Sequence, residues 1–395
     1  MEKLDVVKEI RELKTQLAYS KKIGFFFGAG TSCTLKLPSI AKLTEDVEKA
    51  LTGNELKKFS AIKGDLKGTI GDVNIEDILN QIRKIRELTY DKKDKEYMAV
   101  SGVEAKDLDK AICKKISDII SEAEEKADLT TPIKFFAWLN ILNRVSTKEI
   151  FTTNYDLIIE KSLESSRIPY FDGFVGAYEP FFCQESIEQV VGPADITRNW
   201  IRLWKIHGSL SWFWKLNHAN KSQKIIRVGK FDKASHTDQE LVIYPSKEKY
   251  DSSRKQPFIA YFDKLKNYLL EGEHLFIFSG YSFSDQHIND IVFNCLRQNK
   301  RLFCVVFFYQ DSEVETLHKL PLAYLNLNVF GPTKAIVNGT LYKWDFKKDD
   351  LKDHEKIDSY YDEKSNKLKL GDFSELVNFL ITSSGKTELL TAGKP

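Results

Sequence analysis

One histidine in this chain stands where it could carry out acid–base chemistry. His207 lies in the stretch IHGS at 206–209, directly after a short strand candidate at 204–206. An imidazole titrates near neutrality, so a histidine that enters a pocket here can accept a proton from a sugar hydroxyl. A lone histidine is more often structural, and for this motif taken alone that alternative stays open.

A second set of polar residues follows the strand candidate at 148–152. The stretch TTNYD at 152–156 places Asn154 and Asp156 just past its end. Ligands of open α/β sheets bind at the carboxyl ends of strands, so both side chains are candidates to face such a crevice. The alternative is an N-cap, in which one of them bonds the first free N–H groups of the next helix.

A glycine-rich turn follows the apolar stretch at 23–27. It reads GAGTS at 28–32. Glycine permits positive φ and lets the backbone approach a ligand, and free N–H groups at such a turn favour a phosphate. The turn is not the full dinucleotide fingerprint, because Cys33 stands where the third glycine would be. A plain strand-to-helix turn is the alternative.

A second glycine turn, rich in hydroxyl groups, occupies 278–285 after the apolar run at 274–278. Asp285 at its end also suits an ordinary helix start. His287 and Asn289 follow on that helix, where they either line a pocket or face solvent. Taken alone, this turn therefore does not decide between a binding loop and a connection.

The elements that would position these motifs alternate along the chain. Apolar strands alternating with helices predict an α/β fold with a mostly parallel sheet covered by helices on both faces. The expected strands are 23–27, 148–152, 204–206, 241–244, 274–278 and 302–308, and the expected helices between them include 40–51, 156–165, 258–270 and 284–296.

The remaining segments complete the expected domain organisation. Apolar residues recur at helical spacing near the start, which predicts an amphipathic helix there. A charge-rich helical pattern in the first half predicts a helical insertion subdomain. The predicted division is an N-terminal helix at 1–22, a main domain at 23–75 and 146–310, a helical insertion at 76–145, and a mixed α/β extension at 311–395.

Composition excludes several classes of protein. The 395 residues carry 59 Lys and Arg against 57 Asp and Glu, which gives no reason to expect nucleic acid or a membrane as a partner. The five cysteines form no C-x-x-C pair, so neither a disulfide scaffold nor a four-cysteine zinc site is expected. Met1 to Lys22 lacks the apolar core of a signal peptide. We therefore expect a cytoplasmic chain.

The four motifs in this order, each after a buried strand, resemble the sirtuin family over roughly residues 23–308. Sirtuins consume NAD and have a Rossmann-like large domain with a small inserted domain. The resemblance implies a catalytic role for His207 and a place beside the nicotinamide ribose for Asn154. It also implies NAD contacts from Gly28, Ala29, Gly30, Thr31 and Ser32 at the phosphates, Asp156 at the nicotinamide, and Gly280, Tyr281 and Ser282 near the adenosine half.

The chain also departs from the protein-deacylating sirtuins. The paired C-x-x-C motifs of their zinc ribbon are missing, and LPS at 37–39 is not followed by Asp-Phe-Arg. LPS, FTTNYD and GYSFSD resemble the sirtuin-like domains of bacterial antiphage defence systems, which hydrolyse NAD and deplete it in the host. That resemblance implies NAD as substrate, no zinc, a homo-oligomer, and pairing with a HerA-type hexameric ATPase.

Three other functions stay open at this stage. One is a deacylase that lost its zinc but kept an acceptor groove. Another is a module that senses NAD or ADP-ribose without cleaving it, and a third is a structural subunit of a larger assembly. For the adenosine ribose, the position after the strand at 302–308 makes Gln310 and Asp311 candidates.

Overall fold

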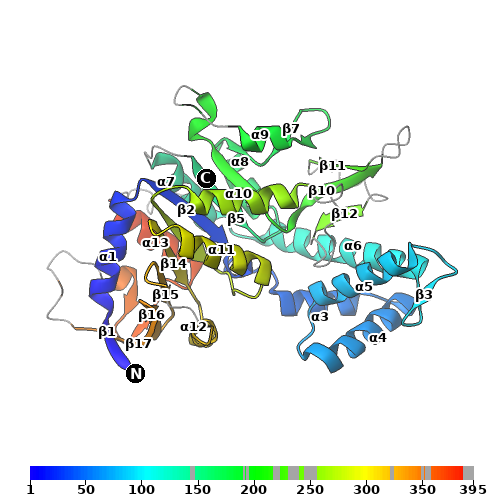
Figure 1. The fold of residues 1–395 in the computed structure, drawn as a ribbon, viewed down its shortest axis with the longest axis horizontal. Coiled ribbons are helices and arrows are strands. Elements are labelled where there is room, and N and C mark those ends of the chain that lie inside the picture. Colours follow the sequence, from blue (N-terminus) through cyan, green and yellow to red (C-terminus); the bar gives the residue numbers. More distant parts are fainter. Residues whose placement is uncertain are drawn as a thin grey trace.

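The computed structural model of the protein is built on a ten-stranded sheet in the order β1-β17-β16-β15-β14-β13-β2-β5-β9-β6 (Figure 1). Seven consecutive strands of this order, from β15 to β6, pair in parallel, and β16 is antiparallel to both its neighbours. The prediction of a mostly parallel sheet is therefore confirmed. The structure describes residues 1–142, 147–189, 192, 195–216, 223–229, 240–243, 256–320, 324–347, 351 and 357–385.

The strands that position the motifs are short and apolar. Phe25 and Phe27 of β2 pack into one apolar core and Phe26 into the other, because successive side chains of a strand point to opposite faces. A strand buried on both faces reads as a continuous apolar run. The bounds are β2 (Lys22–Phe27), β5 (Lys148–Thr152), β6 (Tyr170–Phe171), β9 (Ile201–Lys205), β13 (His274–Ser279), β14 (Leu302–Phe307), β15 (Leu327–Phe330), β16 (Lys334–Val337) and β17 (Thr340–Asp345).

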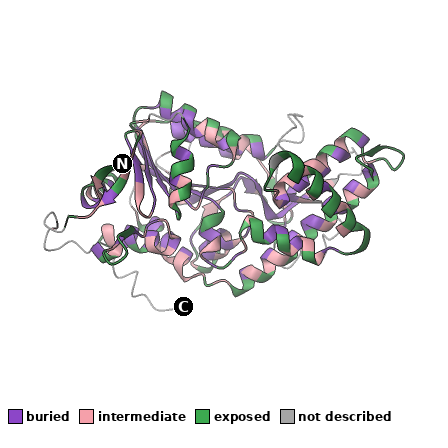
Figure 2. Cartoon of the chain, turned by 90° about the horizontal axis from the view of Figure 1, so that it is seen from below, coloured by how far each residue is buried: buried purple, intermediate pink, exposed green. Residues whose placement is uncertain are grey.

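Helices cover both faces of this sheet, as predicted. One face packs against α1 (Val6–Tyr19), α7 (Thr130–Ile141), α8 (Ile158–Ser165) and α13 (Phe373–Ser383). The other face packs against α10 (Phe258–Leu270), α11 (Gln286–Gln298) and α12 (Asp311–His318). The burial pattern in Figure 2 shows the same layering, with buried strands in the middle and exposed outer faces on the helices.

A separate helical group stands beside the sheet (Figure 1). It comprises α3 (Ile40–Ala50), α4 (Gly53–Ile70), α5 (Ile75–Thr89) and α6 (Gly102–Lys126), which share one apolar core. The division predicted from sequence placed residues 40–70 with the sheet and 130–141 with the insertion. The packing differs, because Phe135 and Trp138 of α7 contact Phe25 of the sheet.

A second, antiparallel sheet has the order β12-β10-β11-β8-β7. The expected strand at 241–244 belongs here, so its predicted place in the parallel sheet was wrong. A short apolar run shows that a strand is buried but not which strand it pairs with; Tyr244 lies outside the described residues. The bounds are β7 (Phe174–Val175), β8 (Phe181–Phe182), β10 (Gly208–Leu216), β11 (Gln223–Arg227) and β12 (Glu240–Ile243).

Strands near the start of the chain and after β14 extend the main sheet. The predicted N-terminal helix is preceded by a strand, β1 (Glu2–Asp5), which pairs in parallel with β17. The apolar residues of α1 fill the core of the sheet. At the other end, β15 to β17 continue the sheet beyond β14. None of the helices among the described residues is both long and apolar enough to span a bilayer.

Candidate active site

The four motifs meet at one edge of the sheet. In the register of β13, β2, β5 and β9, Phe27 pairs with both Ser279 and Thr152, and Thr152 pairs with Lys205. The residues that follow these strands are therefore neighbours, although Phe27 and Ser279 are 252 positions apart in the chain. A cavity of about 2420 Å³ opens beside them, between this edge and the helical group.

The two glycine turns pack backbone against backbone. The N–H of Gly28 donates to Ser279 O at 3.0 Å and the N–H of Gly30 to Gly280 O at 2.9 Å. Gly280 has a φ of +65°, and a Cβ there would lie 2.4 Å from the nitrogen of Thr31. The sequence predicted that these glycines admit a ligand. In the structure the glycines allow the two turns to pack closely against each other. The N–H groups of Gly28 and Gly30, which were expected to be free for a ligand, are bonded to the second turn.

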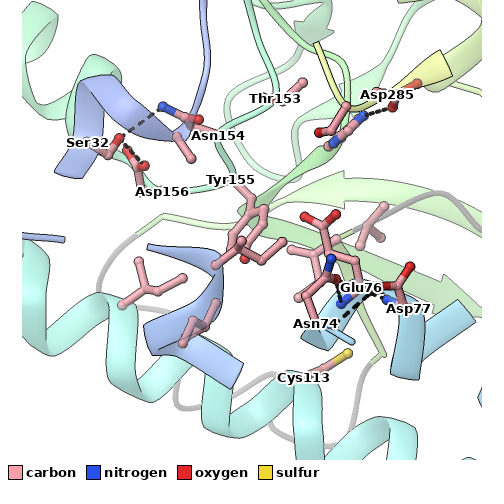
Figure 3. Close-up of a pocket in the computed structure, with 18 of the residues that line it drawn as sticks. Ser32, Asn74, Glu76, Asp77, Cys113, Thr153, Asn154, Tyr155, Asp156 and Asp285 are labelled. Carbon is pink, nitrogen blue, oxygen red and sulfur yellow. Dashed lines mark hydrogen bonds and ion pairs between the residues drawn. The ribbon is translucent and has the colours of Figure 1, made fainter. Parts of the chain in front are cut away.

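Asn154, which follows β5, forms hydrogen bonds to the glycine turn that follows the neighbouring strand β2. Its Nδ2 atom donates to the carbonyl oxygen of Gly28 at 3.0 Å, and it also lies 3.1 Å from Thr31 Oγ1 and 3.0 Å from Ser32 Oγ. The side chain is buried and lines the cavity (Figure 3). Asn154 is therefore a structural tie between two strand ends as well as a candidate for contact with a ligand.

Asp156 belongs to the same buried group. One carboxylate oxygen accepts from the hydroxyl of Ser32 at 2.7 Å, and the other accepts from the N–H of Ile158 at 3.1 Å. Burial raises the pKa of Asp156, and the ammonium group of Lys205 opposes that shift. The N-cap alternative therefore holds in part, because Asp156 bonds the first turn of α8 while also lining the cavity.

His207 and Asp285 are in direct contact at the wall of the cavity. The Nε2 atom of the ring lies 3.0 Å from Oδ2 of the carboxylate, and the histidine side chain is 6% exposed. The next residue, Gly208, has a φ of +89°, and a Cβ there would lie 2.2 Å from the carbonyl oxygen of Val242. The structure therefore explains why glycine follows His207: only glycine lets the chain turn from β9 into β10 at this point.

Asp285 is the site residue that the sequence did not single out. The sequence predicts only a helix start at Asp285, and the residue is indeed the N-cap of α11, where Oδ1 accepts from the N–H groups of His287 and Ile288. Burial alone would raise the pKa of Asp285, but the hydrogen bond and charge of His207 and these N–H groups hold it below its usual value. No sequence signal joins residues 207 and 285.

The other predicted residues divide into those that line the cavity and those that do not. Ala29, Gly30, Ser32, Gly280, Tyr281 and Ser282 line the cavity, whereas Gly28 and Thr31 are not among its lining residues. Tyr281 is buried, and its hydroxyl bonds Asn289 at 3.0 Å. His287 lines the cavity and is exposed.

The two candidates for the adenosine ribose do not line the cavity. Both carboxylate oxygens of Asp311 accept hydrogen bonds from Thr333, and Oδ1 also accepts from the N–H of Lys334. Asp311 therefore holds the turn between β15 and β16. The neighbouring Tyr309 and Glu313 line the cavity instead, a difference that position after a strand could not reveal.

The helical group forms the far wall of the cavity. Figure 3 shows Tyr155 between the strand ends and Asn74, Glu76 and Asp77 of the wall. A buried ion-pair network braces this wall, because Asp109 of α6 bonds Arg83 and Arg86 of α5, and Arg83 also donates to the carbonyl oxygen of Ile243 in β12 at 3.1 Å. The wall is thus fixed to the second sheet.

The described residues contain no group of three or more histidine, cysteine or acidic side chains arranged to hold a metal ion. All five cysteines are free thiols. Cys33 lies at the cavity, and burial raises the pKa of its thiol, with the charge of Asp156 adding to the shift.

Comparison with protein families identifies the domain that holds part of this arrangement. Residues 148–326, a little under half of the chain, match the SIR2-like domain. The chain contains a sirtuin-like domain. The matched residues include β5, β9, β13 and β14, and β2 lies between β5 and β13 in the same sheet. The glycine turn at 28–32 follows β2 and therefore lies in the same sheet as the matched strands, although it is outside the matched segment.

Solved structures with a likeness to the chain include Sir2 proteins. A Sir2 homologue in complex with NAD is 13% identical, with a TM-score of 0.35, over 75% of this chain and 81% of that one. A Sir2 enzyme studied for mechanism and regulation is 11% identical, with a TM-score of 0.36, over 76% and 84%. A Sir2 mutant in complex with 2′-O-acetyl ADP-ribose is 12% identical, with a TM-score of 0.34, over 75% and 83%. Comparison with curated proteins gives no match.

Proposed function

We propose that the sirtuin-like domain binds NAD in this cavity and hydrolyses its nicotinamide–ribose bond, giving nicotinamide and ADP-ribose. One observation carries the proposal. A buried histidine paired with a carboxylate and an asparagine that anchors a glycine turn line the same cavity at the carboxyl edge of a parallel sheet. That edge is where α/β sheets bind nucleotides.

The dinucleotide is oriented by the strand ends. Ala29 and Gly30 are exposed at the cavity and receive the pyrophosphate, while the nicotinamide ribose lies between Asn154 and His207. Because the N–H groups of Gly28 and Gly30 are already bonded, the phosphates depend on the other groups of this turn. A cavity larger than the roughly 300–1,000 Å³ typical of ligand pockets has room for a molecule of this length.

The reaction breaks the bond between the ribose C1 atom and the nicotinamide nitrogen. Nicotinamide leaves with the electron pair, and positive charge develops on the ribose. The oxygen of water forms the new bond to C1, and His207 accepts the proton from the water or a ribose hydroxyl before it passes to solvent. Acid–base catalysis of this kind contributes about 10²- to 10⁴-fold, and positioning adds to it.

Water is the acceptor in this proposal because the chain lacks the paired cysteines that build the zinc ribbon of deacylases. The same motif resemblance supports a role as the effector of a bacterial antiphage system, acting in the cytoplasm as a homo-oligomer with a HerA-type ATPase. Unchecked NAD hydrolysis would harm the host, so we expect activity to depend on assembly or on an infection signal.

The experiment is product analysis of the purified chain with NAD, with and without an acylated peptide, alone and with any ATPase encoded beside it. The hydrolase predicts nicotinamide and ADP-ribose in equal amounts without peptide. Nicotinamide that forms only with the peptide would establish the zinc-less deacylase instead. Tight NAD binding with no product under every condition would establish the sensing module.

A further inference from the structure

We propose that Lys205 is a positioning residue for the candidate site: its buried ammonium group fixes Asp156 and, through a chain of hydrogen bonds, Asn154. This inference rests on the proposed function, which places the nicotinamide ribose beside Asn154. Lys205 does not line the cavity itself. Its side chain is only 2% exposed, so its charge acts on the site from inside the protein.

Lys205 is the last residue of β9, and its side chain lies on the face of the sheet that α8 covers. Trp204, the residue before it, packs into the core on the opposite face, because the side chains of a strand alternate. The Nζ atom of Lys205 donates to the main-chain carbonyl oxygen of Asp156 and, at 2.8 Å, to Oε1 of Glu160 in α8. Lys205 therefore ties the end of β9 to the loop that joins β5 to α8.

A chain of hydrogen bonds leads from Asp156 to Asn154. The hydroxyl of Ser32 donates to Asp156 Oδ2 at 2.7 Å, and the oxygen of the same hydroxyl lies 3.0 Å from Asn154 Nδ2 (Figure 3). An ionised carboxylate only accepts hydrogen bonds, so it engages the hydrogen of Ser32 and leaves the Ser32 oxygen to accept from Asn154. A protonated Asp156 could itself donate to that oxygen and compete with Asn154. The direction of this chain therefore depends on the charge of Asp156.

The charge of Asp156 depends in turn on Lys205. Burial raises the pKa of Asp156, the ammonium group of Lys205 opposes that shift, and the carboxylate of Glu124 adds to it. A neighbouring opposite charge changes the ionisation equilibrium of a carboxyl group by about 10- to 1000-fold. Without Lys205, Asp156 would therefore hold its proton up to a higher pH. The titratable groups around Asp156 include Lys205 of β9, Glu160 of α8, Glu124 of α6, Cys33 of α2 and Tyr155 of the loop itself.

The stability of the fold does not by itself explain this buried charge. A buried ion pair often adds no stability over apolar side chains of similar size, because both charges lose their water. The Oε2 atom of Glu160 is buried and forms no hydrogen bond among the described residues, so the pair of Lys205 with Glu160 is incompletely satisfied. The positive charge is instead placed where it acts on the candidate site.

The test compares two variants that differ only at Lys205. In Glu160→Gln the ammonium group remains, and so does its bond to the carbonyl oxygen of Asp156. In the double variant Lys205→Met/Glu160→Gln that charge is gone, and no unpaired carboxylate at position 160 is left to unfold the chain. Lys148→Met is the matched control for the loss of a buried lysine, because Lys148 donates to the carbonyl oxygen of Asn140 at 2.6 Å, away from the cavity.

The pH dependence of NAD cleavage distinguishes positioning from packing. We expect kcat/KM for NAD to stay within about threefold of the wild type in Glu160→Gln and in Lys148→Met. In the double variant it should lie at least about tenfold below Glu160→Gln at pH 6, and this shortfall should shrink towards pH 9, where Asp156 ionises without Lys205. A shortfall that is constant with pH, as a loss of packing would give, would overturn the proposal, and so would equal kcat/KM in both variants.

A second readout does not depend on NAD. Carbon NMR of the chain labelled at its aspartate carboxyl carbons reports the protonation of Asp156, whose signal is identified by its loss in Asp156→Asn. We expect Asp156 to take up its proton at a higher pH in the double variant than in Glu160→Gln. The same titration in both variants would overturn the proposal.

These two readouts separate the failure of this inference from the failure of the proposed function. If the titration of Asp156 differs as expected but the wild type releases no nicotinamide, the action of Lys205 on Asp156 stands and the hydrolase is wrong. If the wild type cleaves NAD but the titration of Asp156 is the same in both variants, the hydrolase stands and the positioning role of Lys205 is wrong.

Discussion

The side-chain nitrogen of Asn154 donates to the carbonyl oxygen of Gly28 at 3.0 Å, so the residue after β5 closes the turn after β2. Both hydroxyl-bearing residues of that turn, Thr31 and Ser32, lie within 3.1 Å of the same nitrogen. The proposed ribose contact and the proposed phosphate loop are therefore one hydrogen-bonded unit. A change at Asn154 must alter both.

Replacing Asn154 by alanine should weaken the fold and NAD binding together. The substitution removes one of three donors to the buried carbonyl of Gly28, which also accepts from the N–H and the hydroxyl of Thr31, so we expect a loss of about 0.5–1.5 kcal/mol of the free energy of unfolding. Urea denaturation and calorimetric titration with NAD measure the two effects. Asn299→Ala is the control, because Asn299 also donates to two backbone carbonyls, of Leu269 and Gly272, away from the cavity. Equal NAD affinity in both variants would contradict the account.

Replacing Gly280 by alanine should separate the two glycine turns. A Cβ at Gly280 would lie 2.4 Å from the nitrogen of Thr31, whereas a Cβ at Gly272 would meet nothing within 4 Å. Both glycines have positive φ, so the left-handed backbone costs alanine about 1–2 kcal/mol at each position. We expect Gly280→Ala to lose clearly more stability than Gly272→Ala and to weaken NAD binding at least about tenfold. Similar melting temperatures for the two variants would argue against the close packing.

The buried ion pairs of Asp109 with Arg83 and Arg86 should be essential to the stability of the helical group. Asp109→Ala removes the carboxylate that both Arg83 and Arg86 contact, and breaking a buried pair in this way costs about 3–5 kcal/mol. Asp107 on the same helix is exposed, and its replacement by alanine should change stability by less than about 0.5 kcal/mol. Denaturant titration monitored by circular dichroism compares them. A small effect of Asp109→Ala would show that the network contributes little.

His274 should make stability fall in mild acid. It is 1% exposed and packs against the ring of Tyr268, and burial lowers its pKa from 6.5 to about 4. The unfolded chain takes up this proton near pH 6.5 and the folded chain only near pH 4. Stability from this residue is therefore present above pH 6.5 and is lost, by roughly 3 kcal/mol, as the pH falls towards 4.

Urea denaturation at several pH values tests the contribution of His274. His274→Phe should flatten the loss between pH 6.5 and 4, because phenylalanine binds no proton in either state. His318→Gln, which changes an exposed histidine of α12, should leave the wild-type profile unchanged. An unaltered acid profile in His274→Phe would place the sensitive group elsewhere.

The parallel core of the fold could be predicted because its strands are buried on both faces. Runs such as Phe25 to Phe27 are apolar throughout, and a polar or glycine motif follows each one. The second sheet could not be predicted in the same way. The stretch at 241–243 is equally apolar but pairs with β10 in antiparallel order, and apolar composition does not encode the partner of a strand.

The candidate site could be predicted in its four segments but not in its contacts. Asn154 and His207 were found because each follows a strand. The pairing of His207 with Asp285 joins positions 78 residues apart, and an N-cap aspartate looks the same in sequence whether or not a histidine faces it. The sequence could not show that Asp311 lies outside the lining of the cavity for the same reason, because only the fold brings Thr333 to its carboxylate.

The central claim is that this cavity cleaves NAD with His207 as the base. Its most direct test is the rate of nicotinamide release from NAD, without peptide, by the wild-type chain and by His207→Ala at matched concentration and assembly state. We expect stoichiometric nicotinamide and ADP-ribose from the wild type, and a rate at least about 100-fold lower from a variant that still folds. Equal rates from the two proteins, or NAD that stays intact with the wild type in every assembly, would contradict it.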